Sequence, residues 1–154
     1  MKTGAADHHR ILASVQAWRG APMALATVVE TWKSAPCPVG THMLVHADGR
    51  FTGSVSGGCV EGDVLEIARQ VIADNSFAVR RYGVADGSAW EVGLPCGGDI
   101  VVLVQNVSPD YFPGRLFGAI IDAQAAGEVL HIGTDLESGS SSIVQDESVG
   151  LFIN

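Results

Sequence analysis

Glycine clusters at the ends of apolar segments constrain this chain more than any other feature. Glycine accounts for 19 of the 154 residues, whereas proteins usually contain only ~7% glycine. Two of the clusters join a Gly-Gly pair to a cysteine: SGGC at residues 56–59 and CGGD at residues 96–99. Such pairs are typical of turns in which the backbone adopts positive φ or lies against another group.

Composition excludes several classes of protein. The chain is 47% hydrophobic and carries a net charge of −8, which is unfavourable for binding a nucleic-acid backbone. Its longest aliphatic run, residues 100–104, is far shorter than the roughly 18 residues of a membrane helix. The N-terminus lacks an apolar signal core, and three unevenly spaced cysteines form no disulfide framework or CxxC motif. We therefore expect a cytoplasmic globular protein with a single domain over residues 1–154.

Hydrophobic periodicity predicts both helices and strands. Helices are expected from residue 7 to about 19, from 60 to about 73, and over 116–124 with a stop at Gly127. Strands are expected at residues 23–31, 41–46, 51–55, 77–82, 100–105 and, weakly, 129–132, whereas ESGSSS at 137–142 is predicted to be a solvated loop. This alternation indicates an α/β or α+β fold, a mixed sheet with a hairpin and packed helices. No GxGxxG dinucleotide (Rossmann) fingerprint is present.

The segment GSVSGGCVEGDV, residues 53–64, is the first candidate site. Here Gly57 and Gly58 lie between a predicted strand and a predicted helix, where backbone amides and the helix dipole can hold an anion such as phosphate. No Lys-Ser/Thr pair follows, so the segment is not a Walker A loop. Cys59 lies at the helix start, which favours its thiolate. Glu61 and Asp63 are more typical of acids that complement the helix dipole than of catalytic groups.

The second candidate site is GLPCGGDI, residues 93–100, where Cys96 precedes Gly97, Gly98 and a buried strand. Alone, this motif is more typical of a tight turn with a structural cysteine. If its strand neighbours the one before Gly57, however, both loops converge and offer two thiols beside amide donors.

A third loop, residues 33–40, contains Lys33, the Ser34 hydroxyl and the Cys37 thiol, and is otherwise a rigid turn between strands. His42 and His46 are four residues apart, which in a strand separates them by roughly 13 Å. The two histidines are therefore unsuitable as joint ligands of one metal ion.

The segments ATVVETWKSAPCPVGTHMLVHADGRFTGSVSGGCVEGDV and LPCGGDIVVLVQ together resemble the XdhC/CoxI family of molybdoenzyme accessory proteins, over about residues 22–106. The resemblance implies an N-terminal domain of a non-enzymatic chaperone. Such a chaperone binds and protects the molybdenum cofactor, assists its sulfuration and delivers it to an apo-molybdoenzyme of the xanthine dehydrogenase or carbon monoxide dehydrogenase type. A cysteine desulfurase and a second copy of the chain are further candidate partners.

The resemblance also implies which residues contact the cofactor: Ser34, Ser56, Gly57, Gly58, Cys59, Glu61, Cys96, Gly97 and Gly98. Glycine amides suit its phosphate, or the diphosphate of its cytosine dinucleotide form, and Cys59 and Cys96 are soft candidate ligands for molybdenum. Lys33 and Cys37 stand where family members usually have Gly and Arg, so Lys33 is left as the positive charge of that loop.

Two alternative functions stay open at this point. One is a thiol-dependent sulfur transferase that acts on the cofactor. The other is a regulatory module that binds an ordinary nucleotide.

Overall fold

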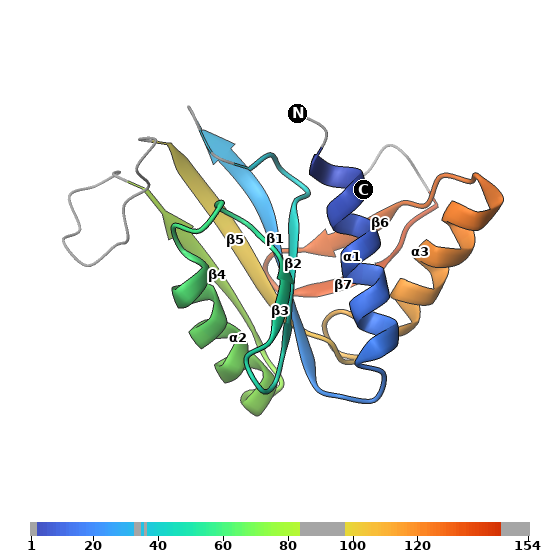
Figure 1. Cartoon of the computed structure of the whole chain (residues 1–154), viewed down its shortest axis with the longest axis horizontal. Helices are drawn as coiled ribbons and strands as arrows, with labels where there is room; N and C mark the ends of the chain where they lie inside the picture. Colours follow the sequence, from blue (N-terminus) through green and yellow to red (C-terminus); the bar gives the residue numbers. More distant parts are fainter. Residues whose placement is uncertain (1–2, 33–34, 36, 84–97, 146–154) are drawn as a thin grey trace.

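The computed structural model describes residues 3–32, 35, 37–83 and 98–145. Within these ranges three helices and seven strands follow one another along the chain (Figure 1). The elements are α1 (Thr3–Ala17), β1 (Met23–Trp32), β2 (His42–His46), β3 (Phe51–Gly53), α2 (Glu61–Asp74), β4 (Phe77–Tyr82), β5 (Asp99–Asn106), α3 (Arg115–Ala126), β6 (Ile132–Asp135) and β7 (Ser140–Ile143).

Five strands form one sheet in the order β3-β2-β1-β5-β4, and β6 and β7 form a separate hairpin. Every described strand pairing is antiparallel. The predicted combination of strands, hairpin and helices is therefore confirmed, in its α+β form, but the sheet is antiparallel and not mixed as predicted. The interior position predicted for the strand at residues 100–105 is also confirmed, because β5 lies between β1 and β4 and all of its residues are buried.

Helices cover both faces of the large sheet (Figure 1). The helix α2 packs on one face, where Val64 and Val71 join strand residues such as Val28 and Val102 in one buried cluster. The helices α1 and α3 lie on the other face, where Ile11 joins a second cluster. Side chains alternate between the two faces along each strand, so the apolar run of β5 contributes to the core on both sides.

The predicted helix from residue 60 is confirmed, with α2 beginning at Glu61 immediately after the SGGC segment. The predicted start of the first helix at residue 7 is wrong, because α1 begins at Thr3. The strand predicted at 51–55 is two residues shorter, because Gly53 turns out of the sheet at φ +84°. A Cβ atom at Gly53 would lie 2.4 Å from the backbone oxygen of His42, so only glycine fits there.

The C-terminal part of the described chain differs most from the prediction. The strand β6 begins at Ile132 rather than 129, and the serine-rich stretch predicted to be a solvated loop contains β7. The buried side chain of Gln105 explains this difference. Its amide nitrogen donates to the Gly139 oxygen and to Ser141 Oγ, both at 2.9 Å, so these polar residues are held against the sheet. None of the described helices is long and apolar enough to cross a bilayer.

Candidate functional site

The antiparallel pairing brings the ends of several strands together at one end of the large sheet. Trp32, which ends β1, pairs with Asp99, which begins β5, and Tyr82 at the end of β4 pairs with Ile100. Gly53, at the end of β3, pairs with Met43 of β2. The segment before β5 and the SGGC segment after β3 therefore leave the sheet at the same end, although β2 and β1 separate the two strands. We call this the loop end of the sheet.

The carboxylate of Glu61 lies at the centre of the SGGC loop. Its Oε1 atom accepts hydrogen bonds from Ser54 Oγ at 2.5 Å and from the amides of Val55 and Ser56 at 3.1 and 3.0 Å. Its Oε2 atom accepts from Ser56 Oγ at 2.6 Å and from the Gly58 amide at 2.9 Å. Five donors from the loop thus converge on one buried carboxylate, which fixes the loop to the start of α2.

These hydrogen bonds determine the charge of Glu61. Burial by itself raises the pKa of its carboxyl group, but the hydrogen bonds from Ser54 and Ser56 outweigh burial and lower the pKa to about 2. Hydrogen bonds to the charged form of an acid favour that form. Glu61 is therefore ionised at neutral pH.

The predicted phosphate site is filled by the protein's own carboxylate in this structure. The remaining amides of the loop also have partners, because Gly57 donates to Ser54 Oγ and both Cys59 and Val60 donate to Ser56 Oγ. Every backbone N–H from residue 55 to residue 60 is therefore used within the loop. The prediction that Gly57 and Gly58 hold a phosphate through their N–H groups does not fit this loop conformation.

The two glycines instead shape the loop. Gly57 and Gly58 have φ values of +73° and +115°, and a Cβ atom at either would have nothing within 4 Å. Their requirement is therefore conformational, because side chains rarely tolerate this backbone region. The turn leaves Cys59 exposed immediately before α2.

The predicted site residues can be placed only in part. Ser34, Cys96 and Gly97 lie outside the described residues, so the proximity of Cys59 and Cys96 stays a prediction. Gly98 is buried at the entry to β5. Cys37 is half-buried and packs against the core cluster that contains Val55 and Val60.

The loop end also holds a charged cluster that the sequence did not reveal. The guanidinium of Arg81 lies 3.5 Å from the Asp99 carboxylate and 4.8 Å from the ring centre of Trp32. Asp99 is only 8% exposed, and a Cβ atom at Gly83 would lie 1.7 Å from its Oδ1 atom. No short-range motif joins Arg81, Trp32 and Asp99, because only strand register brings them together.

Nearby, the hydroxyl of Tyr82 donates to Asp63 Oδ2 at 2.5 Å. Burial and this hydrogen bond both raise the pKa of Tyr82, so its hydroxyl stays protonated and joins the end of β4 to the first turn of α2. Across the described ranges, no three side chains of the His, Cys, Asp or Glu type converge as a metal site.

Comparison with known proteins relates part of this arrangement to a family. Residues 17–83 match the model of the XdhC and CoxI family. This range contains β1, β2, β3, the Glu61-centred loop, α2 and β4. This segment is therefore similar to the XdhC and CoxI family.

Two curated relatives match the chain over more residues than the segment 17–83 that matches the family model. The molybdenum cofactor insertion chaperone PaoD of Escherichia coli strain K12 is 38% identical over 104 residues, which are 66% of this chain and 32% of PaoD. A protein of Bacillus subtilis strain 168, named as a probable xanthine dehydrogenase subunit, is 32% identical over 88 residues, which are 56% of this chain and 27% of that protein. The chain therefore spans about a third or less of the length of these relatives.

A solved structure shares the fold that carries the XdhC and CoxI segment. The crystal structure of a xanthine dehydrogenase from Bacillus halodurans superimposes with a TM-score of 0.73 at 28% sequence identity. The match covers 93% of this chain and 44% of that chain. The likeness thus extends well beyond residues 17–83, the segment that matches the family model.

Proposed function

We propose that this chain forms part of an accessory protein that binds the molybdenum cofactor and delivers it to an apo-molybdoenzyme of the xanthine dehydrogenase or carbon monoxide dehydrogenase type. The observation that carries this proposal is the exposed thiol of Cys59, presented by a loop that Glu61 fixes with five hydrogen bonds. The names of PaoD and of the Bacillus subtilis relative support it.

A rigidly presented thiol suits a soft metal centre that is carried as cargo. A thiolate is a soft ligand that binds several transition metals, and Cys59 is the exposed thiol of this loop. Holding Cys59 in place before the cofactor arrives also reduces the entropy lost on binding. The chain's role in this proposal is to bind, orient and release the cofactor without chemical turnover.

The nine residues named from the family resemblance form the proposed contact surface, with distinct roles. Cys59 and Cys96 contact the molybdenum, whereas Gly57, Gly58, Ser56 and Glu61 position Cys59. Ser34, Gly97 and Gly98 contribute from the neighbouring loops. We propose that the cofactor's phosphate is held by side-chain cations at the loop end, such as Arg81, because the glycine amides already bind Glu61.

Several finer features belong to the same proposal. The cofactor is protected while bound and receives its sulfur with the help of a cysteine desulfurase. The protein acts in the cytoplasm, can pair with a second copy of itself, and accepts the cytosine dinucleotide form of the cofactor.

The decisive experiment is anaerobic incubation of the protein with molybdenum cofactor, followed by gel filtration and molybdenum analysis. We expect molybdenum to co-elute in a fixed ratio to protein, and Cys59→Ser to lose most of it. Cys37→Ser serves as the control because it also removes one thiol. Co-elution at the same ratio with Cys59→Ser would contradict the thiol contact, and no co-elution with the unaltered protein would contradict the proposed function.

A second measurement addresses catalysis. The protein is incubated with cofactor and a sulfur donor, and the amount of sulfurated cofactor is compared with the amount of protein. We expect at most one equivalent, because the proposal assigns binding and not turnover. Many equivalents per protein would favour a sulfur transferase instead.

A further inference from the structure

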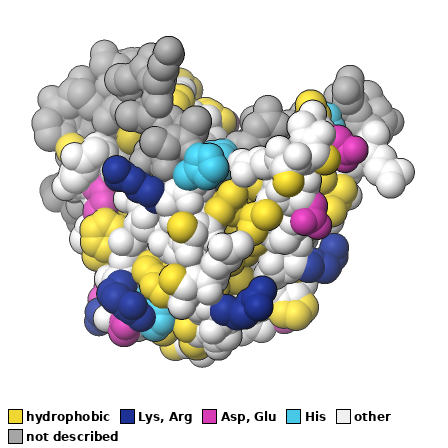
Figure 2. Space-filling view, turned by 45° about the vertical axis from the view of Figure 1, so that its right-hand side comes forward, with side chains coloured by type: hydrophobic (Ala, Val, Ile, Leu, Met, Phe, Trp, Pro, Cys, Tyr) yellow, Lys and Arg dark blue, Asp and Glu magenta, His cyan; other side chains and the backbone are white. Residues whose placement is uncertain are grey.

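A cavity lies on the face of the sheet opposite α2, between α1, α3 and β6. Its volume is about 330 Å³. Its walls are mostly apolar, with Ile11 and Leu12 from α1, Leu25 from β1, Phe117 from α3 and Phe112 from the segment before α3. Hydrophobic side chains crowd the middle of this face in the space-filling view (Figure 2). The volume is at the lower end of the roughly 300–1,000 Å³ of small-molecule sites, which suits one small ring system.

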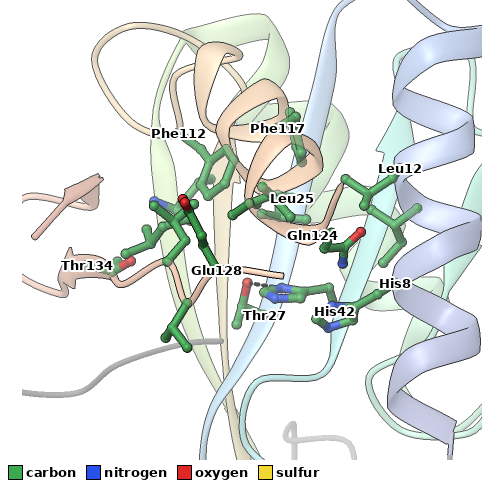
Figure 3. Close-up of a pocket in the computed structure, with 17 residues that line it drawn as sticks. His8, Leu12, Leu25, Thr27, His42, Phe112, Phe117, Gln124, Glu128 and Thr134 are labelled. Atoms are coloured by element: carbon green, nitrogen blue, oxygen red, sulfur yellow. Dashed lines mark hydrogen bonds between the residues drawn. The ribbon is translucent and has the colours of Figure 1, made fainter. Parts of the chain in front are cut away.

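The floor of the cavity contains a polar pair that is partly buried. His42 Nδ1 and Thr27 Oγ1 are 2.8 Å apart (Figure 3), and Thr27 is 2% exposed. Burial lowers the pKa of His42 to about 3, with a smaller contribution from His8. The imidazole is therefore neutral at physiological pH. Because Nδ1 is bonded to Thr27, Nε2 is the ring nitrogen left for another partner.

Gln105 adds an oriented acceptor to the cavity wall. Both protons of its side-chain nitrogen have acceptors, Gly139 O and Ser141 Oγ. An amide has one nitrogen with two protons and one carbonyl oxygen. What Gln105 offers to the cavity is therefore its carbonyl oxygen, held in one orientation by β7.

The charges around the cavity limit what can bind. None of the residues that line it is Lys or Arg, and Glu128 is the single acid among them. A phosphate or carboxylate placed there would be desolvated without a cation to compensate it, which is unfavourable. The cavity therefore suits an uncharged group that presents N–H donors to a carbonyl and a carboxylate.

We infer that this cavity binds a neutral, flat bicyclic heteroaromatic ring that carries amino or amide N–H groups along one edge. The aromatic pair Phe112 and Phe117, with ring centres 4.9 Å apart, and Leu25 contact the faces of the ring. Gln105 and His42 bond its polar edge. The class of ring rests on the cavity alone and not on the proposed function; free pterin and guanine are both rings of this class and serve as probes.

The site is separate from the Cys59 loop. The cavity opens between α1 and α3, whereas Cys59 stands at the start of α2 on the opposite face of the sheet (Figure 1). Ring binding is therefore expected to be independent of the thiol, which allows the two sites to be tested separately.

The test is a fluorescence titration of the protein with free pterin, repeated with guanine as a competitor. Ala123→Trp fills the cavity from α3, and Ala125→Trp is the matched control, because Ala125 is exposed on the same helix and does not line the cavity. We expect Ala123→Trp to weaken pterin binding about tenfold or more, or ~1.4 kcal/mol. Ala125→Trp should keep the affinity of the unaltered protein.

A second variant tests the cavity independently, in case Ala123→Trp does not fold. Thr27→Val keeps the volume of the floor but removes the hydrogen bond to His42, so we expect a smaller loss of affinity. The inference is overturned if the unaltered protein binds neither pterin nor guanine, or if neither variant weakens binding. If pterin binds as expected but molybdenum never co-elutes with the protein, the proposed function fails and the ring site stands.

Discussion

The amide of Gly58 donates a hydrogen bond to the carboxylate of Glu61 at 2.9 Å, closing the SGGC turn onto the first residue of α2. The anion at this helix start is the chain's own carboxylate, whereas the glycine pattern predicted a bound phosphate. The amides of the loop bind Glu61 and thereby fix the loop. Their role is therefore to hold Cys59 in place.

Replacing Glu61 by Gln should destabilise the protein. An amide group keeps the size of the side chain but presents an NH₂ to donors that need an acceptor. Leaving buried donors unsatisfied costs about 1–3 kcal/mol, so we expect the free energy of unfolding in urea to fall by that amount. Glu66→Gln is the control, because Glu66 is exposed on the same helix. Equal stability of the two variants would show that Glu61 does not hold the loop.

Glu61 should also give the protein a distinct acid transition. Its folded pKa of about 2 lies below the ordinary value of 4.5, so the unfolded state binds more protons between these values. Its stabilising effect is thus complete above about pH 4.5 and is lost as the pH falls towards 2. Urea unfolding from pH 5 to 2 should show a steeper loss for the unaltered protein than for Glu61→Gln, and parallel curves would contradict this.

His42 should lower the free energy of unfolding on acidification, and should do so at a higher pH than Glu61 does. Burial, with a smaller contribution from His8, lowers the folded pKa of His42 to about 3 from the ordinary value of 6.5. The unfolded state therefore binds a proton on this imidazole below about pH 6.5, whereas the folded state does not. Stability should fall as the pH drops below about 6.5, by at most ~1.4 kcal/mol per pH unit. His42→Phe should flatten the dependence between pH 6.5 and 5, whereas His9→Phe at an exposed position should not. The same slope in both variants would count against His42.

Gly83→Ala should disturb the charged cluster at the loop end. The added Cβ atom would lie 1.7 Å from Asp99 Oδ1 and 3.1 Å from Asp99 Cα, so Asp99 must move away from Arg81. Overpacking of this kind usually costs about 1–3 kcal/mol. Gly62→Ala is the control, since nothing lies within 4 Å of that position in α2, and alanine should stabilise the helix by about 1 kcal/mol or less. Thermal unfolding of both variants measures the contrast.

Cys59 should react with an alkylating reagent faster than Cys37. Cys59 is exposed just before α2, whereas Cys37 is half-buried against the core, and an accessible thiol reacts faster than a buried one. Mass spectrometry of each labelled peptide gives the two rates. Added molybdenum cofactor should slow the labelling of Cys59 and Cys96 together and leave Cys37 unchanged. Protection of Cys37 alone would contradict the paired-thiol site.

The sequence alone determined the elements whose pattern is local. The switch from alternating to helical periodicity at Cys59 predicted α2, and the apolar run IVVLV predicted the buried strand β5. The Gly57-Gly58 pair predicted a tight turn before α2, but the phosphate expected on its amides does not fit the loop, whose donors bind Glu61.

Only the tertiary structure decided which groups meet. Glu61 binds the loop amides because the loop folds back onto α2. Arg81 reaches Asp99 because the register of β4 and β5 places them close together. The serine-rich stretch became β7 because the buried amide of Gln105 needs acceptors, a demand that arises some 35 residues away. A short window of sequence carries propensity and periodicity, but hydrogen-bond partners of buried polar groups are set by long-range packing.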